Sequence, residues 1–150
     1  MTRRRIVLAT IPGAVFCLAQ GPAARAADPA ALTFGQLYKS FGIRGYEYSD
    51  TLQLLKGRDV VMHGYMAPPL KPESSFFVLT REPVALCPFC QSDAEWPADI
   101  VVIYLKSASP LVSAGDSVAV HGRLEVGSWT DPETGFVSQI RLRDAAYRRD

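Results

Sequence analysis

Hydrophobic side chains in the second half of the chain follow the two-residue rhythm of β-strands rather than a helical spacing. Runs rich in β-branched and aromatic residues, each bounded by glycine, proline or a polar cluster, predict five strands. The third run is continuously apolar, which is typical of a strand buried on both faces. Turn-forming residues separate the later runs. The predicted strands are residues 58–65, 76–80, 100–105, 117–126 and 136–145.

Two of these strands carry an internal glycine at a similar place. Residues 57–64, GRDVVMHG, resemble residues 115–122, GDSVAVHG. A glycine inside a strand permits the sharp coiling that closes a small barrel. Five strands, two of them coiled, predict a mainly β fold, specifically a small five-stranded OB-like barrel over residues 58–150.

The segment before the strands predicts short helices. Thr33 and Gln36 have the spacing of a capping box for a helix that continues through Lys39. Ser49 or Asp50 can cap a second helix over residues 51–56, which Gly57 ends. We therefore expect residues 27–57 to form an N-terminal helical cover. Its apolar stripe, expected to pack on the domain, is Phe34, Leu37, Tyr38 and Phe41.

The first 26 residues have the composition of an export signal. Arg3, Arg4 and Arg5 precede an apolar run that is too short to span a membrane. Ala24-Arg25-Ala26 fits the Ala-x-Ala cleavage pattern, so we expect cleavage after Ala26, a periplasmic location and no membrane span afterwards. The start also resembles a twin-arginine signal, and the sequence leaves that route and the general secretory route open.

Removal of this signal changes the charge and the cysteine count. The chain has 16 Lys and Arg and 15 Asp and Glu; four of the arginines lie in the signal, so residues 27–150 carry a net charge of −3. Because this domain has no basic stripe, we expect no nucleic-acid partner. Cys17 leaves with the signal, so Cys87 and Cys90 are the cysteines of the exported domain, in an oxidising compartment.

Cys87-Pro88-Phe89-Cys90 lies in the long connection between the second and third strands. Its thiolates can bind one zinc or similar soft ion, as half of a site completed by Asp93, Glu95, a histidine or a partner chain. Alternatively, the pair forms a disulfide, as exported cysteines often do. The third hypothesis is a thiol–disulfide oxidoreductase, although Pro97 leaves little room for the helix that activates such a thiol.

Other candidate residues stand apart from this motif. Gln91 rather than His follows Cys90, so covalent haem of the usual kind is excluded. His63 and His121 would approach each other if the first and fourth strands pair, and are otherwise unrelated strand histidines, with His121 facing solvent. A group of aromatic residues either forms a face for a peptide or glycan or packs at an edge. These are Tyr46, Tyr48, Tyr65 and Trp129.

Several motifs together resemble a known family. They are Gly57-x-x-Val60-x-Met62-x-Gly64-Tyr65-Met66-x-Pro68, Phe76-Phe77-Val78-Leu79, Cys87-Pro88-Phe89-Cys90 and Pro97-x-x-Ile100-Val101-Val102. The chain resembles, roughly from Phe34 to Ala145, a family of exported bacterial proteins known only as a domain of unknown function. Its layout is similar to that of exported, cysteine-bearing OB-like subunits that accompany bacterial permeases thought to handle metals. The resemblance implies an OB-like fold, an exported location and an envelope protein partner such as a transporter or permease.

The sequence contains no nucleophile elbow, catalytic triad or glycine-rich phosphate loop. We therefore expect no catalytic residues and a periplasmic, non-enzymatic OB-like accessory or binding module. Its loop would hold zinc or a disulfide at Cys87 and Cys90, and the module would dock on an envelope or transporter assembly. The alternatives are a small thiol–disulfide oxidoreductase and a purely structural module with a loop disulfide.

Overall fold

The computed structural model describes residues 28–42, 45–68, 75–84, 98–107, 113 and 115–150. The chain is mainly β, as predicted, and α1 is the one α-helix among the described residues. In chain order the elements are β1 (Ala30–Ala31), the 3₁₀ turn η1 (Phe34–Gln36), β2 (Tyr38–Gly42), β3 (Gly45–Tyr48), α1 (Asp50–Leu55), β4 (Asp59–Met66), β5 (Phe76–Thr80), β6 (Ile100–Leu105), β7 (Ser117–Thr130) and β8 (Val137–Arg149).

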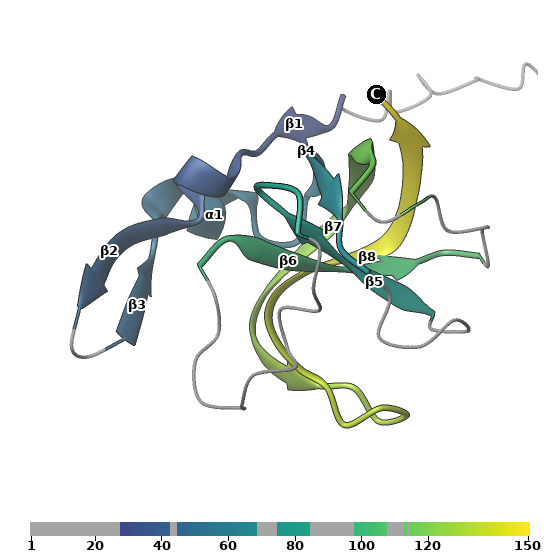
Figure 1. Ribbon diagram of the computed structural model, residues 1–150. Coiled ribbons are helices and arrows are strands. Elements are labelled where there is room, and N and C mark those ends of the chain that lie inside the picture. The colour runs from purple at the N-terminus through teal and green to yellow at the C-terminus, as the bar shows by residue number, and fades with distance from the viewer. Residues whose placement is uncertain (1–27, 43–44, 69–74, 85–97, 108–112, 114) are drawn as a thin grey trace, which may run out of the picture.

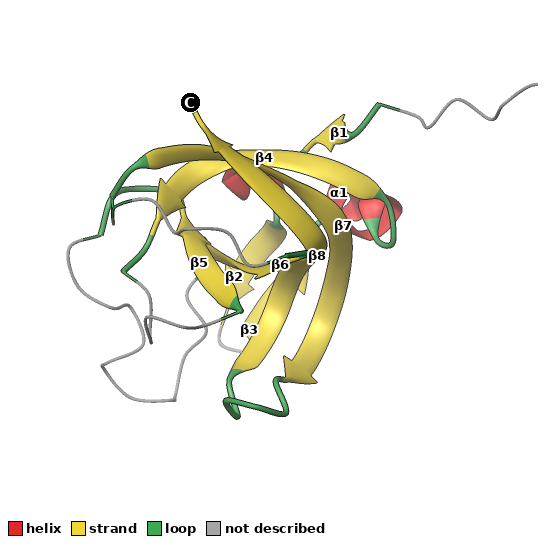
Figure 2. Ribbon diagram, turned by 90° about the vertical axis from the view of Figure 1, so that its right-hand side faces the viewer, coloured by secondary structure: helices red, strands yellow, loops and turns green. Residues whose placement is uncertain are grey.

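Six strands form one sheet in the order β1-β4-β5-β6-β8-β7, and β4 also pairs with β7. The pairs β1–β4 and β6–β8 are parallel, and the others are antiparallel. The sheet is strongly curved, with its strands crossing around a common interior (Figure 2). A separate two-stranded sheet, the β2–β3 hairpin, stands at the left of Figure 1.

The five predicted strands are all present, and the last two are longer than expected. The predicted fourth strand stops before Gly127, because glycine commonly indicates a turn. Gly127 instead has φ +117°, and the β7–β8 register shifts between Val126 and Trp129, so the glycine lies in a bulge within the strand. The strand continues through Thr130, and β8 runs on to Arg149. The bulge therefore lies within β7, and the β7–β8 hairpin continues beyond it.

The predicted helix through Lys39 is wrong beyond its first turn. The Thr33 N–H does donate to Gln36 Oε1 at 3.0 Å, as a capping box requires, but only η1 follows. The next residues form β2, which pairs with β3 across a turn where Gly45 has φ +97°. Tyr38, Phe41, Tyr46 and Tyr48 are residue types that favour strands, which explains the outcome.

The second predicted helix is confirmed as α1. Ser49 is its N-cap, because its side-chain oxygen accepts a hydrogen bond from the Leu52 N–H at 3.0 Å. Gly57 follows the helix with φ +78°, a conformation that favours glycine. Leu52 and Leu55 are buried in the core, and each such leucine stabilises the fold by about 1.5–3 kcal/mol. The N-terminal cover is therefore a hairpin and one helix rather than two helices.

One hydrophobic core fills the curve of the sheet and joins it to the N-terminal elements. The expected apolar stripe takes part, since Phe34, Leu37 and Tyr38 are all buried there. Alternate residues of the strands supply the rest: Val60, Met62, Met66, Phe77, Leu79, Val101, Ile103, Val118, Val120, Leu124, Val126, Ile140, Leu142 and Ala145. The opposite face of β5, β6, β7 and β8 therefore presents a second set of side chains.

Both internal strand glycines lie where a neighbouring backbone comes too close for a side chain. A Cβ added at Gly64 would lie 2.6 Å from the Thr80 carbonyl oxygen. One added at Gly122 would lie 2.9 Å from the Arg143 carbonyl oxygen. Opposite Gly122, β8 has an irregular register, and Asp144 there has φ +49°. The glycines thus permit close strand crossings, which agrees with the expected strand coiling.

Candidate binding face

The predicted cysteine site, Cys87 and Cys90, lies outside the described residues, as do Asp93 and Glu95. The structure does describe the two ends of the segment that carries them. The Arg81 N–H donates to the Asp99 carbonyl oxygen at 3.2 Å, and Arg81 Nη2 lies 2.7 Å from Asp99 Oδ1. Arg81 and Asp99, which flank the segment that carries the cysteines, are therefore joined by both a backbone hydrogen bond and an ion pair.

A small apolar cluster lies next to this contact. Val84 packs against Ala67, Val78 and Ile100, all of which are buried. Thr80, also buried, donates its hydroxyl hydrogen toward the Tyr65 and Glu82 carbonyl oxygens, at 3.2 and 2.7 Å. The residues around the cysteine segment are thus held by ordinary packing and hydrogen bonds of the sheet.

The most elaborate group of polar side chains lies on the face of the sheet opposite the core. We call it the Arg–aromatic cluster: Tyr104 of β6, Glu125 and Trp129 of β7, and Arg141 and Arg143 of β8. It arises from strand alternation. Ile140 and Leu142 point into the core, so their neighbours Arg141 and Arg143 face the other way.

Arg143 is held between two aromatic rings. Its guanidinium carbon lies 3.9 Å from the Trp129 ring centroid and 4.3 Å from that of Tyr104, within range of cation–π attraction. The Tyr104 and Trp129 rings meet edge to face at 5.3 Å. Arg143 is 28% exposed, so its charge can be reached from outside the cluster.

Arg141 is more deeply buried and is bonded to the β7–β8 hairpin. Its Nε donates to Glu125 Oε2 at 2.7 Å, and its Nη1 donates to the Gly127 carbonyl oxygen at 2.8 Å. Nη1 also lies 3.3 Å from both the carbonyl and hydroxyl oxygens of Ser138. Arg143 Nε shares the same Glu125 oxygen at 3.4 Å. The Glu125 carboxylate therefore accepts hydrogen bonds from both Arg141 and Arg143.

Burial and charged neighbours shift the pKa values of Glu125 and Tyr104. Burial by itself would raise the pKa of Glu125, but hydrogen bonds and charge attraction from Arg141 and then Arg143 bring that pKa below its usual value. Burial, followed by the Asp131 carboxylate, raises the pKa of Tyr104 far above its usual value. The Tyr104 hydroxyl is buried close to Asp131 without a hydrogen bond of normal geometry. Tyr104 therefore stays neutral at physiological pH.

The adjoining β7–β8 turn is built around Asp131. Its Oδ1 accepts hydrogen bonds from the Glu133 N–H at 3.0 Å, the Thr134 N–H at 2.8 Å and the Thr134 hydroxyl at 2.9 Å. The predicted turn at residues 131–135 is confirmed, with Gly135 at φ +73°. After the turn, Phe136 makes a tilted ring contact with Phe76 at 5.5 Å, and Phe76 itself contacts Tyr104 at 5.1 Å. The turn thus extends the cluster's aromatic surface.

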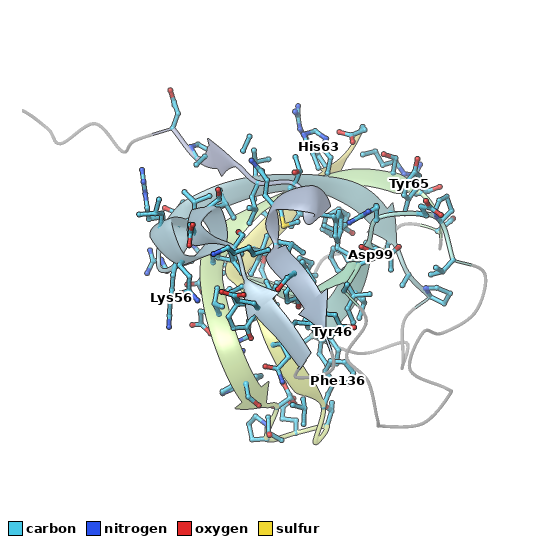
Figure 3. The ribbon with its side chains drawn as sticks, turned by 90° about the vertical axis from the view of Figure 1, so that its left-hand side faces the viewer. Tyr46, Lys56, His63, Tyr65, Asp99 and Phe136 are labelled. Carbon is cyan, nitrogen blue, oxygen red and sulfur yellow. The ribbon has the colours of Figure 1, made fainter. Side chains whose placement is uncertain are left out.

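The ring contacts of the described residues divide the predicted aromatic face into separate groups. Tyr46 makes a tilted contact with Tyr38 at 4.9 Å and Tyr48 stacks with it at 5.8 Å, whereas Trp129 belongs to the Arg–aromatic cluster. Figure 3 shows Tyr65 at the upper right, apart from Tyr46 lower in the view. The Tyr48 hydroxyl donates to Gln139 Oε1 of β8 at 3.2 Å.

The two histidines lie on another face of the sheet. Pairing of β4 with β7, on which their approach depended, is present, with His63 opposite Ala119 and His121 opposite Val61. His121 is exposed, as predicted. Among the described residues, no group of three or more His, Cys, Asp and Glu side chains is placed to hold a metal ion. Within the same residues, no helix is long and apolar enough to cross a membrane.

Sequence reasoning did not single out Arg141, Arg143, Glu125 or Tyr104. One signal was present: two arginines alternate with Ile140 and Leu142 in an otherwise apolar strand. Such alternation indicates a charged sheet face, but it does not show that β6 lies beside β8 in parallel and brings Tyr104 to the arginines.

Comparison with known proteins identifies one similar fold. No protein-family model and no curated protein matches the chain. A crystal structure of a DUF3299 family protein from Pseudomonas aeruginosa PAO1 is similar, with a TM-score of 0.50 and 14% sequence identity. The match covers 81% of this chain and 97% of that one. The likeness supports the expected relation in fold to an uncharacterised domain of unknown function.

Proposed function

We propose that the protein is an exported, non-catalytic OB-like binding module that docks on an envelope protein assembly such as a transporter. The observation that carries this proposal is the pairing of β4 with β7. With it, each of the five strands β4, β5, β6, β8 and β7 pairs with two others of the five, and β4 pairs with β1 as well. A five-stranded ring of this kind is the arrangement of an OB-like barrel, a fold that commonly binds extended partners.

The Arg–aromatic cluster is the proposed docking surface. OB-like barrels bind partners on the outer face of their second and third strands and on flanking loops. Here β5 and β6 correspond to those strands and supply Phe76 and Tyr104, which are buried beneath the surface. The β7–β8 turn supplies Phe136, which is partly exposed and contacts Phe76. Aromatic and arginine side chains are also the residue types enriched at protein interfaces. The partly exposed Arg143 favours a partner surface that carries a carboxylate.

Site-specific photo-crosslinking in the cell envelope tests this proposal. A photoreactive residue at position 136 is expected to capture one discrete envelope protein, and Arg143→Ala in the same chain should reduce that product. The control position is Lys56, which Figure 3 places well away from Phe136. Equal capture from positions 56 and 136, or capture unaffected by Arg143→Ala, would contradict the assignment of this face.

The export part of the proposal has its own test. Periplasmic protein should begin at Ala27, which intact mass measurement detects directly. Cytoplasmic protein that retains residues 1–26 in an export-competent host would contradict the proposed location.

At the loop, Cys87 and Cys90 are proposed to hold either a zinc ion or a disulfide. Native mass spectrometry of protein purified without chelator separates these states. A zinc-shifted mass that Cys90→Ser abolishes supports the metal, and a metal-free mass lacking both thiol hydrogens supports the disulfide. Insulin reduction that depends on Cys87 would instead identify a thiol–disulfide oxidoreductase and contradict the non-catalytic proposal.

A further inference from the structure

The only two histidines of the chain share one exposed face of the β4–β7 pair. Directly opposite residues in a sheet lie on the same face, and here His63 faces Ala119 while Val61 faces His121. His121 is two residues along the strand from Ala119, so it points to the same side as His63. The histidines are therefore diagonal neighbours, about 7–8 Å apart at the backbone, a separation that long side chains can span.

Both histidine side chains are open to solvent. The His63 side chain is 60% exposed, and His121 is exposed as well. Ala119 lies opposite His63, while Val61 and Ala146 lie opposite His121 on its two sides. A metal ion above this face can therefore reach both rings.

Asp150 orients the first of these imidazoles. Its Oδ2 lies 2.9 Å from His63 Nδ1 and accepts a hydrogen bond from the Ser117 hydroxyl at 3.2 Å. An ionised carboxylate can only accept, so His63 donates its Nδ1 hydrogen to Asp150. In the neutral ring this tautomer leaves the Nε2 lone pair available to a metal ion. Metal-bound histidines usually have this arrangement, with a carboxylate on the second nitrogen.

We propose that His63 and His121 bind one divalent ion of the Cu²⁺, Ni²⁺ or Zn²⁺ class, with Asp150 as the positioning residue for His63. Neutral imidazole is a preferred ligand for these ions, and Cu²⁺ binds most tightly in the usual order. Two nitrogens leave the remaining coordination positions to water, so the site suits reversible binding rather than a structural centre. Its proposed ligands include neither cysteine and none of the residues of the Arg–aromatic cluster.

The test is imidazole NMR of untagged full-length protein labelled with ¹⁵N-histidine, in a Cys87→Ser/Cys90→Ser background. Because the chain has only two histidines, each ring gives its own signals. Before metal is added, His63 should show hydrogen on Nδ1. Added Zn²⁺ should shift the signals of both rings together and saturate at one equivalent.

Variants measured by calorimetry with Cu²⁺ complete the test. His63→Asn and His121→Asn should each weaken binding at least about tenfold, and Asp150→Asn should weaken it by roughly 10-fold or more, the usual effect of losing such a carboxylate. Glu47→Gln, which changes an exposed carboxylate of the β2–β3 hairpin, is the matched control and should bind as the parent does. A response from one ring alone, or unchanged affinity in His121→Asn, would overturn the shared site.

Discussion

Replacing Gly64 with alanine should destabilise the fold through one close strand crossing. The new Cβ would lie 2.6 Å from the Thr80 carbonyl oxygen, 3.0 Å from Leu79 Cγ and 3.1 Å from Phe34 Cε2. The first of these is a backbone atom between paired strands, so β5 would have to move rather than a flexible side chain. The crossing is also where β4 begins to pair with β5, through Tyr65 and Thr80.

The size of the effect follows from two opposing terms. Overpacking a well-packed core costs about 1–3 kcal/mol, and a backbone contact lies at the upper end. Alanine also restricts the unfolded chain, which offsets about 0.4–1 kcal/mol. We therefore expect a net loss of about 2 kcal/mol in the free energy of unfolding. For a chain of this size, that loss lowers the melting temperature by roughly 4–8 °C.

Urea denaturation followed by tryptophan fluorescence measures this change, with circular dichroism as a second probe. Gly35→Ala is the matched control, because a Cβ there meets no heavy atom within 4 Å and its φ is not in the left-handed region. The control should be unchanged or slightly stabilised. If Gly64→Ala unfolds at the wild-type urea concentration while Gly35→Ala behaves as expected, the crossing is not as close as described, and the reasoning fails.

Four further predictions concern β8 and its turn. Arg141→Ala should lower the free energy of unfolding by about 2–3 kcal/mol, which is less than the loss of a fully buried ion pair because Glu125 is partly exposed. Arg123→Ala removes an exposed ion pair and should lower the free energy of unfolding by less than about 1 kcal/mol. Urea titrations of the two variants compare these losses. Because the pKa of Glu125 is lowered in the folded protein, the stability that its ion pairs contribute is present above its unfolded pKa and is lost as pH falls through the lower folded value. The difference in free energy of unfolding between wild type and Arg141→Ala should therefore shrink under acidic conditions. A difference that stays constant with pH would refute the pairing. Asp131→Ala should cost about 1–2 kcal/mol through the lost turn hydrogen bonds and should let Tyr104 ionise at lower pH, seen by phenolate absorbance in an alkaline titration, whereas Glu133→Ala should do neither. Asp144→Gly should raise stability by roughly 0.5–1 kcal/mol, because relief of the positive-φ penalty of about 1–2 kcal/mol outweighs the loss of about 0.4–1 kcal/mol from the greater freedom of glycine in the unfolded chain. Asp144→Val should lower stability, and thermal melts that rank the two variants the other way would contradict the assigned backbone.

Strand prediction succeeded because the relevant information is local. The continuous run Ile100–Leu105 and the alternation in residues 117–126 depend only on neighbouring side chains, and both became strands. The helix predicted through Lys39 failed because the spacing of residues 34–41 fits a helix while their aromatic side chains favour a strand. The predicted packing of this stripe on the domain is confirmed for Phe34, Leu37 and Tyr38. A distant contact accompanies the strand outcome: the Tyr48 hydroxyl bonds to Gln139, far along the chain.

The Arg–aromatic cluster could not be derived from local pattern, because its members come from three strands. Tyr104 meets Arg143 only because β6 runs parallel beside β8, a non-local pairing. The histidine pair is intermediate. Its approach was predicted on the condition that the two strands pair, and the repeated His-Gly positions in residues 57–64 and 115–122 were visible in the sequence.

The contact between Arg81 and Asp99 keeps the two ends of the cysteine-bearing segment next to each other. Because both attachment points are fixed beside each other by β5 and β6, a change in length between them alters the free energy of folding only slightly, by about 0.6 kcal/mol for each doubling. The sheet can therefore keep its strand pairing when residues 85–97 are lengthened, shortened or exchanged. Variation in this segment would let one scaffold acquire different chemistry while the strands that support it stay the same.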